Sequence, residues 1–348
     1  MRRHAFALYC LLLTLLAIAA AEFVLLPQLH GLPRATLLAG FAARPADIID
    51  GQRINALGFT GDDIAAQKAP GTVRVLLLGS STLFNRHLGE RLKAALQQRS
   101  GKTVELLDAG IRSHTSRADL LKLQLLAHYQ WDYVLFYDGI NDLWANHVLP
   151  QDFHDDYRQL DPWYYRNALL DRSLLARYGY NLLHAQWRTL NRRLGERWQP
   201  DYQFVFAKKP YVNAAGFASL ESYRNNVSAI INLAQHHGAT PVLLTFASYL
   251  PDNYTRQAFL DGTLGYHNPD QYDSRDVFNW GPPAYVREGL QRQNAILREL
   301  AAQHGVPLVD IDSAMSGRGE WFGDVCHFND EGVDVFVNHV ANALSPLR

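Results

Sequence analysis

The chain has 348 residues, with 33 Lys and Arg against 34 Asp and Glu, and a formal net charge of -1. At roughly 100–200 residues per domain, this length allows two or three small domains or one enlarged α/β domain. An apolar fraction of 48% beside 19% charged residues supplies a buried core, which excludes intrinsic disorder. The balanced charge argues against a nucleic-acid partner. Only two cysteines are present, which excludes a disulfide-stapled fold and a zinc site built from several thiolates.

Residues 1–26 have the composition of a membrane-spanning helix. Arg2 and Arg3 precede an apolar run over 5–26 that is interrupted only by Glu22. As a helix this run would extend about 33 Å, close to the hydrocarbon thickness of a bilayer. The small residues at 19–21 also offer a signal-peptidase site, so a cleaved signal peptide competes with the uncleaved anchor that we favour. In both cases the arginines stay cytoplasmic and the rest lies outside, on the periplasmic side in a Gram-negative cell.

Residues 27–72 are rich in Pro and Gly, which predicts a stalk that leads into the main domain. From residue 73 to 348, short apolar runs alternate with helical patterns. The predicted strands are 73–78, 104–107, 133–137, 241–246 and 307–311, and the predicted helices include 117–129, 220–237, 284–304 and 330–344. Buried strands alternating with helices predict a doubly wound α/β domain with a five-stranded, mostly parallel sheet. Functional sites of this class lie at the carboxyl ends of the strands.

Two insertions interrupt this alternation. The longer one, 143–216, is rich in aromatic residues and contains Trp144, Trp163, Trp187 and Trp198. We expect a helical subdomain with its own aromatic core, although a cap over a sugar or acyl groove would have the same composition. The shorter insertion, 247–283, is polar and is predicted to be loop-like.

The first predicted strand ends in Gly79-Ser80-Ser81-Thr82, directly before a helix. A serine at such a turn lies near free backbone N–H groups at the positive end of a helix dipole. That position suits a nucleophile whose product is an oxyanion. Taken alone, the pattern is more typical of a simple helix cap.

The next two strands also end in polar motifs. Gly110 follows the second strand, and Asn141 follows the third. The N–H of Gly110, the side-chain NH2 of Asn141 and the N–H of the serine would together form an oxyanion hole. Separately, the glycine would be an ordinary turn residue and the asparagine an ordinary cap.

A histidine motif, Asp324-Val325-Cys326-His327, lies between the last strand and the last helix. A neutral histidine accepts a proton from serine at neutral pH, and a nearby carboxylate fixes its tautomer. Cys326 is interpreted as a small buried side chain rather than a nucleophile.

In chain order, these motifs resemble the SGNH (GDSL-like) hydrolase superfamily, and the stretch 53–61 resembles its membrane-anchored bacterial members. The resemblance covers about 53–142 and 217–344. It implies a flavodoxin-like three-layer α/β/α sandwich and ester hydrolysis without a metal or other cofactor. Ser81 would be acylated, His327 would act as general base and then acid, and Asp324 would orient it. The oxyanion hole would consist of Ser81, Gly110 and Asn141.

Two positions depart from the family pattern. The first motif has Gly-Ser-Ser-Thr in place of Gly-Asp-Ser-Leu, so the choice of Ser81 over Ser80 depends on the register. Asp108 stands where an asparagine is usual. A further group of metal-ligand residues, Asp152, His154, Asp155 and Asp156, is interpreted as a solvated acidic loop, and we expect no metal site.

The favoured hypothesis is a membrane-anchored serine esterase that hydrolyses O-acyl esters, such as acetyl esters of an envelope glycan. An O-acyltransferase would use the same triad, with a sugar hydroxyl instead of water resolving the acyl-serine. A third hypothesis is a catalytically silent glycan-binding protein. The expected partners are an ester substrate and the membrane.

Overall fold

The computed structural model describes residues 2–25, 48–49, 51–160, 175, 216–270 and 274–345. The predicted stalk is therefore described only in part. In the longer insertion, the predicted cap or subdomain residues Trp163, Trp187 and Trp198 lie outside the described residues.

The main sheet consists of β3 (Thr60–Gly61), β4 (Thr72–Gly79), β5 (Thr103–Asp108), β6 (Tyr133–Tyr137), β7 (Thr240–Leu244) and β8 (Leu308–Val309). Their order is β3-β5-β4-β6-β7-β8, with every pair parallel except β3 and β5. The predicted doubly wound α/β class is confirmed. The expected five-stranded sheet is wrong by one strand, because two residues of the lead-in segment pair antiparallel with β5. A two-residue strand is too short to leave a hydrophobic pattern.

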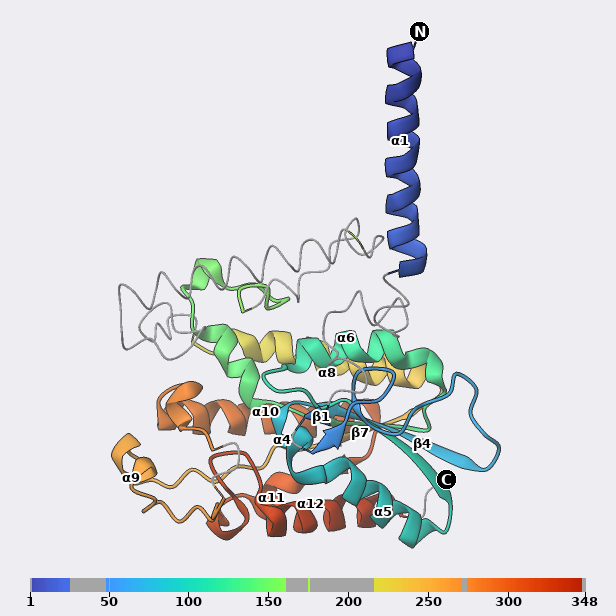
Figure 1. The fold of residues 1–348 in the computed structure, drawn as a ribbon. Helices are drawn as coiled ribbons and strands as arrows, with labels where there is room; N and C mark the ends of the chain where they lie inside the picture. The colour runs from blue at the N-terminus through green and yellow to red at the C-terminus, as the bar shows by residue number, and fades with distance from the viewer. Residues whose placement is uncertain are drawn as a thin grey trace.

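The long helices that cover the sheet are α5 (Leu88–Ser100), α6 (Ser116–Leu126), α8 (Ser219–His236), α10 (Pro283–His304) and α12 (Asp330–Ala343). In Figure 1, α6 and α8 lie on one side of the sheet, and α5 and α12 lie on the other. The side chains of β4 alternate between the two layers: Val75 and Leu77 pack in the core cluster of α5 and α12, and Leu76 and Leu78 pack with α6 and α8. Burial on both faces explains why the strand sequence is apolar without alternation.

Short helices fill the connections. They are α4 (Ser81–Phe84), α9 (Arg256–Leu260), α11 (Ile311–Met315) and the 3₁₀ turns Asn85–His87, Ala127–Tyr129, Ile140–Asn146, Pro150–Asp152, Val277–Asn279 and Gly319–Trp321. The helix expected directly after β4 is interrupted, since Arg86 and His87 have left-handed φ values of 51° and 57°. A small hairpin, β1 (Ile48–Ile49) with β2 (Gln52–Arg53), precedes β3.

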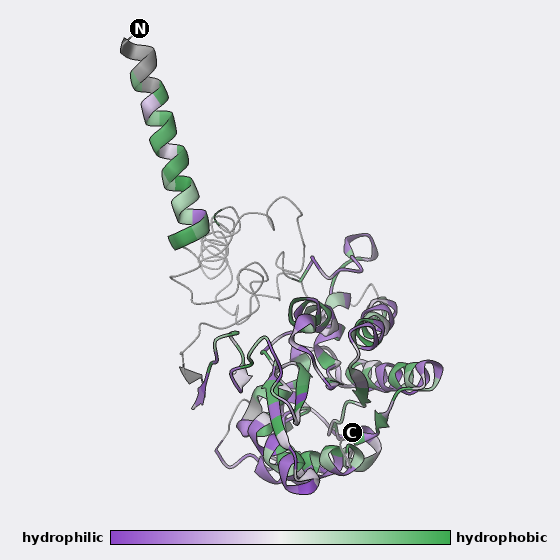
Figure 2. Ribbon diagram, turned by 90° about the vertical axis from the view of Figure 1, so that its right-hand side faces the viewer, coloured by the Kyte–Doolittle hydropathy of each residue, from purple (hydrophilic) through white to green (hydrophobic). Residues whose placement is uncertain are grey.

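At the N-terminus, α1 (Arg2–Ala20) continues into a π-helical turn, Ala21–Leu25. The window Leu8–Leu25 has a mean hydropathy of 2.3 and is long and apolar enough to cross a membrane, although a signal sequence has the same properties. Figure 2 shows hydrophobic colour along most of this helix.

The two insertions contribute to the domain core through their described residues. Tyr157, from the longer insertion, is completely buried. In its described residues, the shorter insertion contains α9 and the turn Val277–Asn279 and is otherwise irregular, as expected for a loop. It also buries Tyr254 and Trp280, so it is more firmly packed than its polar composition indicates.

Candidate active site

The side chains of Asp324, His327 and Ser81 form one hydrogen-bonded chain. His327 Nε2 lies 2.9 Å from Ser81 Oγ, and His327 Nδ1 lies 2.7 Å from Asp324 Oδ2. The distances fit a relay in which Nδ1–H donates to the carboxylate, so that Nε2 is free to accept the serine proton. Asp324 and His327 are buried, whereas Ser81 is partly exposed. This hydrogen-bonded arrangement has the geometry for a base and an orienting carboxylate beside a partly exposed serine.

Backbone N–H groups hold the Asp324 carboxylate. The N–H groups of Cys326 and His327 donate to Oδ1 at 2.9 and 2.8 Å, and the N–H of Arg275 donates to Oδ2 at 2.6 Å. Such charge-assisted bonds favour the ionised carboxylate and fix its rotation. Because the loop from Asp324 to His327 is this tight, a spacing of three residues lets the carboxylate reach the imidazole of His327.

The two adjacent serines have different environments. Ser80 is fully buried, and its hydroxyl donates to Asp138 Oδ1 at 2.9 Å. Ser81 begins α4, and its hydroxyl faces His327. Since α4 is a single turn, the helix dipole expected behind the serine is small. Stabilisation of a negative charge at Ser81 would therefore depend more on the nearby backbone N–H groups than on the dipole.

Gly110 follows β5 at a position where only glycine fits. A Cβ at this residue would lie 2.8 Å from the Cβ of Leu83 and 2.9 Å from the Ser80 carbonyl oxygen. Its N–H donates to Asp108 Oδ1 at 2.8 Å. The acidic residue at position 108 thus contacts one of the N–H groups expected to bind the oxyanion.

Asn141 lies in the 3₁₀ segment Ile140–Asn146, directly after β6. Its Nδ2 donates to the carbonyl oxygen of His114 at 2.7 Å, and its Oδ1 accepts from Trp280 Nε1 at 2.8 Å. The neighbouring Asp142 Oδ1 accepts from Ser116 Oγ at 2.5 Å and from Tyr157 Oη at 2.9 Å. These bonds tie the end of β6 to α6 and to the start of the longer insertion.

The side chain of Lys122, from α6, connects the carboxyl ends of β4 and β5. Its Nζ donates to the carbonyl oxygens of Gly79 and Ala109 at 2.8 and 2.7 Å, and lies 2.6 Å from Asp119 Oδ1. Both charged side chains are fully buried. Gly79 and Ala109 precede the serine pair and Gly110, so the ammonium group holds together the two turns that carry them.

Several buried carboxyl groups near these turns have raised pKa values. Desolvation raises the pKa of Asp108 to about 6, opposed by the Gly110 N–H bond and by Lys122. It raises the pKa of Asp142 to about 7, and it raises that of Asp138 well above the usual range, with help from Asp119 and Asp142. Burial lowers the pKa of His114 well below its usual value. Burial therefore favours the neutral, protonated form of these carboxyl groups.

The one group of possible metal-ligand residues in the described part of the chain overlaps the hydrogen-bonded chain itself. Among the described residues, metal-ligand atoms gather within 4.8 Å of one another only at Asp324, Cys326 and His327, and not in the acidic loop 152–156. Two of those three side chains, Asp324 and His327, are already hydrogen-bonded to each other.

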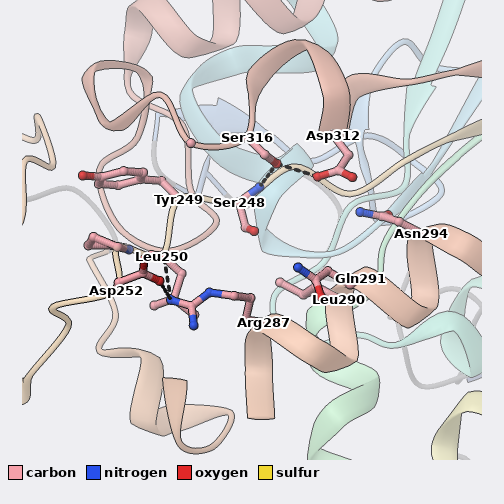
Figure 3. Close-up of a pocket in the computed structure, with 12 residues that line it drawn as sticks. Ser248, Tyr249, Leu250, Asp252, Arg287, Leu290, Gln291, Asn294, Asp312 and Ser316 are labelled. Carbon is pink, nitrogen blue, oxygen red and sulfur yellow. Dashed lines mark hydrogen bonds and ion pairs between the residues drawn. The ribbon is translucent and has the colours of Figure 1, made fainter. Parts of the chain in front are cut away.

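A cavity of about 270 Å³ lies at the ends of β7 and β8, lined by Ser248, Arg287, Asp312 and others (Figure 3). In this cavity Arg287 pairs with Asp252, and Asp312 accepts a hydrogen bond from Ser316.

Trp280 and Lys122 are parts of the site region that sequence reasoning missed. Trp280 lies in a segment taken for a polar loop. Lys122 had a weak signal, because it is a charged residue three positions after Asp119 in a leucine-rich helical stretch.

The sequence matches the model of the GDSL-like Lipase/Acylhydrolase family over residues 59–335, which is most of the chain. A search of curated proteins found no significant match. Among solved structures, the lipase/acylhydrolase from Enterococcus faecalis is similar at 13% identity and a TM-score of 0.42, covering 78% of this chain and 95% of that one. The hydrolase LAE5 from the Lake Arreo metagenome is 17% identical, with a TM-score of 0.42 and 81% and 99% coverage. The acetylxylan esterase Axe2 from Geobacillus stearothermophilus is 11% identical, with a TM-score of 0.42 and 78% and 94% coverage.

The family match includes the strand ends that carry Ser81, Gly110 and Asn141, as well as the Asp324-x-x-His327 motif. By the extent of this match, the chain belongs to the GDSL-like lipase/acylhydrolase family.

Proposed function

We propose that this acylhydrolase is a serine esterase that uses Ser81, His327 and Asp324. The hydrogen-bonded chain from Asp324 through His327 to Ser81 Oγ is the observation that carries the proposal. Ser81 attacks the ester carbonyl while His327 Nε2 takes its proton, and the resulting imidazolium is stabilised by Asp324. His327 then returns the proton to the leaving alcohol, and water attacks the acyl-serine by the same route.

The negative oxygen of the tetrahedral intermediate is bound by the N–H groups of Ser81 and Gly110 and by the NH2 of Asn141. Two features support this assignment. Two hydrogen bonds fix the Asn141 amide and leave one N–H of its NH2 group for the oxyanion. The absence of a side chain at Gly110 keeps its backbone open to a substrate, and its N–H would exchange the bond to Asp108 Oδ1 for one to the oxyanion.

The proposed substrate is an O-acyl ester, such as an acetyl ester, of an envelope glycan. The N-terminal segment supports it, because an apolar helix that begins with Arg2 and Arg3 would carry the rest of the chain outside the cytoplasm, either as an anchor or as an export signal. An acylated envelope glycan would be within reach of a domain in that position.

The test compares hydrolysis of 4-nitrophenyl acetate by the purified protein and three variants. Ser81→Ala and His327→Ala should lose activity by a factor of about 10³ or more while retaining the circular dichroism of the wild type. Ser80→Ala, which loses only a bond to Asp138, should keep most of the activity. Undiminished hydrolysis by Ser81→Ala would refute the mechanism. Acetate release from an acetylated envelope polysaccharide tests the substrate, and an acylated sugar product would indicate a transferase instead.

A further inference from the structure

The indole of Trp280 contacts Asn141, the only side-chain donor of the proposed oxyanion hole. We propose that Trp280 is a positioning residue for this reaction: its N–H holds the Asn141 amide in the orientation that presents NH2 to the oxyanion. The inference rests on the proposed function, because Asn141 stabilises an oxyanion only if Ser81 attacks an ester.

An asparagine amide has two orientations of nearly the same shape, which differ by exchange of oxygen and nitrogen. At Asn141, Nδ2 donates to the His114 carbonyl and Oδ1 accepts from Trp280 Nε1. An indole N–H can only donate and a carbonyl oxygen can only accept. A flipped amide would therefore meet N–H with N–H and oxygen with oxygen. The two contacts select one orientation, in which the second N–H of Nδ2 is left for the reacting oxygen.

The indole itself is firmly held. Trp280 is 2% exposed, and its ring stacks on that of Trp144 with centroids 6.0 Å apart and planes 11° from parallel. The Trp144 indole N–H donates to the carbonyl oxygen of Asn279 at 2.7 Å. The backbone N–H of Trp280 donates to the carbonyl oxygen of Val277 at 2.9 Å. Because the donor is fixed before substrate binds, it needs no reorganisation during the reaction.

The segment 275–280 also reaches the other end of the site. Its first residue, Arg275, donates a backbone N–H to Asp324 Oδ2. Between the two contacts, Asp276 Oδ1 accepts from the Phe278 N–H at 3.2 Å and from Tyr254 Oη at 3.0 Å. The shorter insertion thus contacts Asp324 through the backbone of Arg275 and Asn141 through the side chain of Trp280.

A double-mutant cycle tests the proposal, using 4-nitrophenyl acetate and four proteins: wild type, Trp280→Phe, Asn141→Ala and the double variant. Loss of one hydrogen bond to Asn141 should lower kcat about tenfold in Trp280→Phe, with KM little changed. In the Asn141→Ala background the same substitution should cause no further loss, because its effect acts through the missing amide. Trp131→Phe is the matched control: it removes a buried indole N–H that donates to the carbonyl oxygen of Leu126 at 2.7 Å and does not contact Asn141, and it should lower kcat no more than about twofold.

An equal loss from Trp280→Phe in both backgrounds would show a packing role and overturn the proposal, as would an unchanged kcat in the single variant. If Trp280→Phe does not fold, the sulfur isostere of tryptophan, benzothienylalanine, keeps the ring shape at position 280 and removes only the N–H. It should give the same tenfold loss, and wild-type activity would overturn the proposal. Failure of the proposed function is distinguishable, because Ser81→Ala would then remain active.

Discussion

The buried Asp108 carboxyl makes the stability of this protein depend on pH in a defined direction. Burial raises its pKa from 3.8 to about 6, so the folded state binds a proton that the unfolded state has released. Stability from this group is present at low pH and is lost as pH rises through about 6. The full range is about 3 kcal/mol, and the loss between pH 5 and pH 8 is about 1.4 kcal/mol, since pH 5 lies about one unit below the folded pKa.

The substitution Asp108→Asn removes the titration while keeping the shape and the acceptor for the Gly110 N–H. Urea unfolding of the wild type and the variant at pH 5 and pH 8 gives four free energies of unfolding. Between the two pH values, the variant should gain about 1.4 kcal/mol relative to the wild type. This difference of differences cancels any constant effect of the amide and any contribution from Asp142. Parallel pH profiles for the two proteins would refute the reasoning.

Three further predictions concern the site and its support. Lys122→Met should lower the free energy of unfolding by about 3–5 kcal/mol, because it leaves the buried Asp119 carboxylate without its ion-pair partner. Lys93→Met, which breaks a partly exposed ion pair, should lower it by at most about 1 kcal/mol, and equal losses in urea unfolding would contradict the prediction. Asp324→Asn should lower kcat by a factor of about 10⁴ and also lower the melting temperature, because its NH2 would face the N–H of Arg275; steady-state rates near wild type would argue against an orienting role. Gly110→Ala should lower both kcat and the melting temperature, the latter through about 1–3 kcal/mol of strain, and a variant with wild-type values for both would show that the turn has room.

The layers of the fold could be predicted because a strand that is buried on both faces of the sheet has a continuous apolar sequence. The continuous apolar run at the centre of β4 divides between two cores, Val75 to one side and Leu76 to the other. The polar motifs meet because parallel strands end at one edge of the sheet. The predicted relay residues therefore lie within hydrogen-bond distance, while their catalytic roles and the domain boundaries stay predictions.

The features that escaped prediction depend on contacts between distant segments. β3 is two residues long, and only its pairing with β5 defines it as a strand. Trp280 contacts Asn141 across 139 positions of sequence, and no local pattern encodes such a contact. The break at Arg86 and His87 places two non-glycine residues in the left-handed region, against their local preference.

The central claim is that Ser81 is the nucleophile and that His327 activates it. The most direct measurement is the site and rate of covalent labelling by a fluorophosphonate, with the modified residue located by tandem mass spectrometry. The account predicts one label on Ser81 in the wild type and in Ser80→Ala, and a rate at least about 10³ lower in His327→Ala. A label on Ser80, or labelling of Ser81 that does not depend on His327, would contradict it.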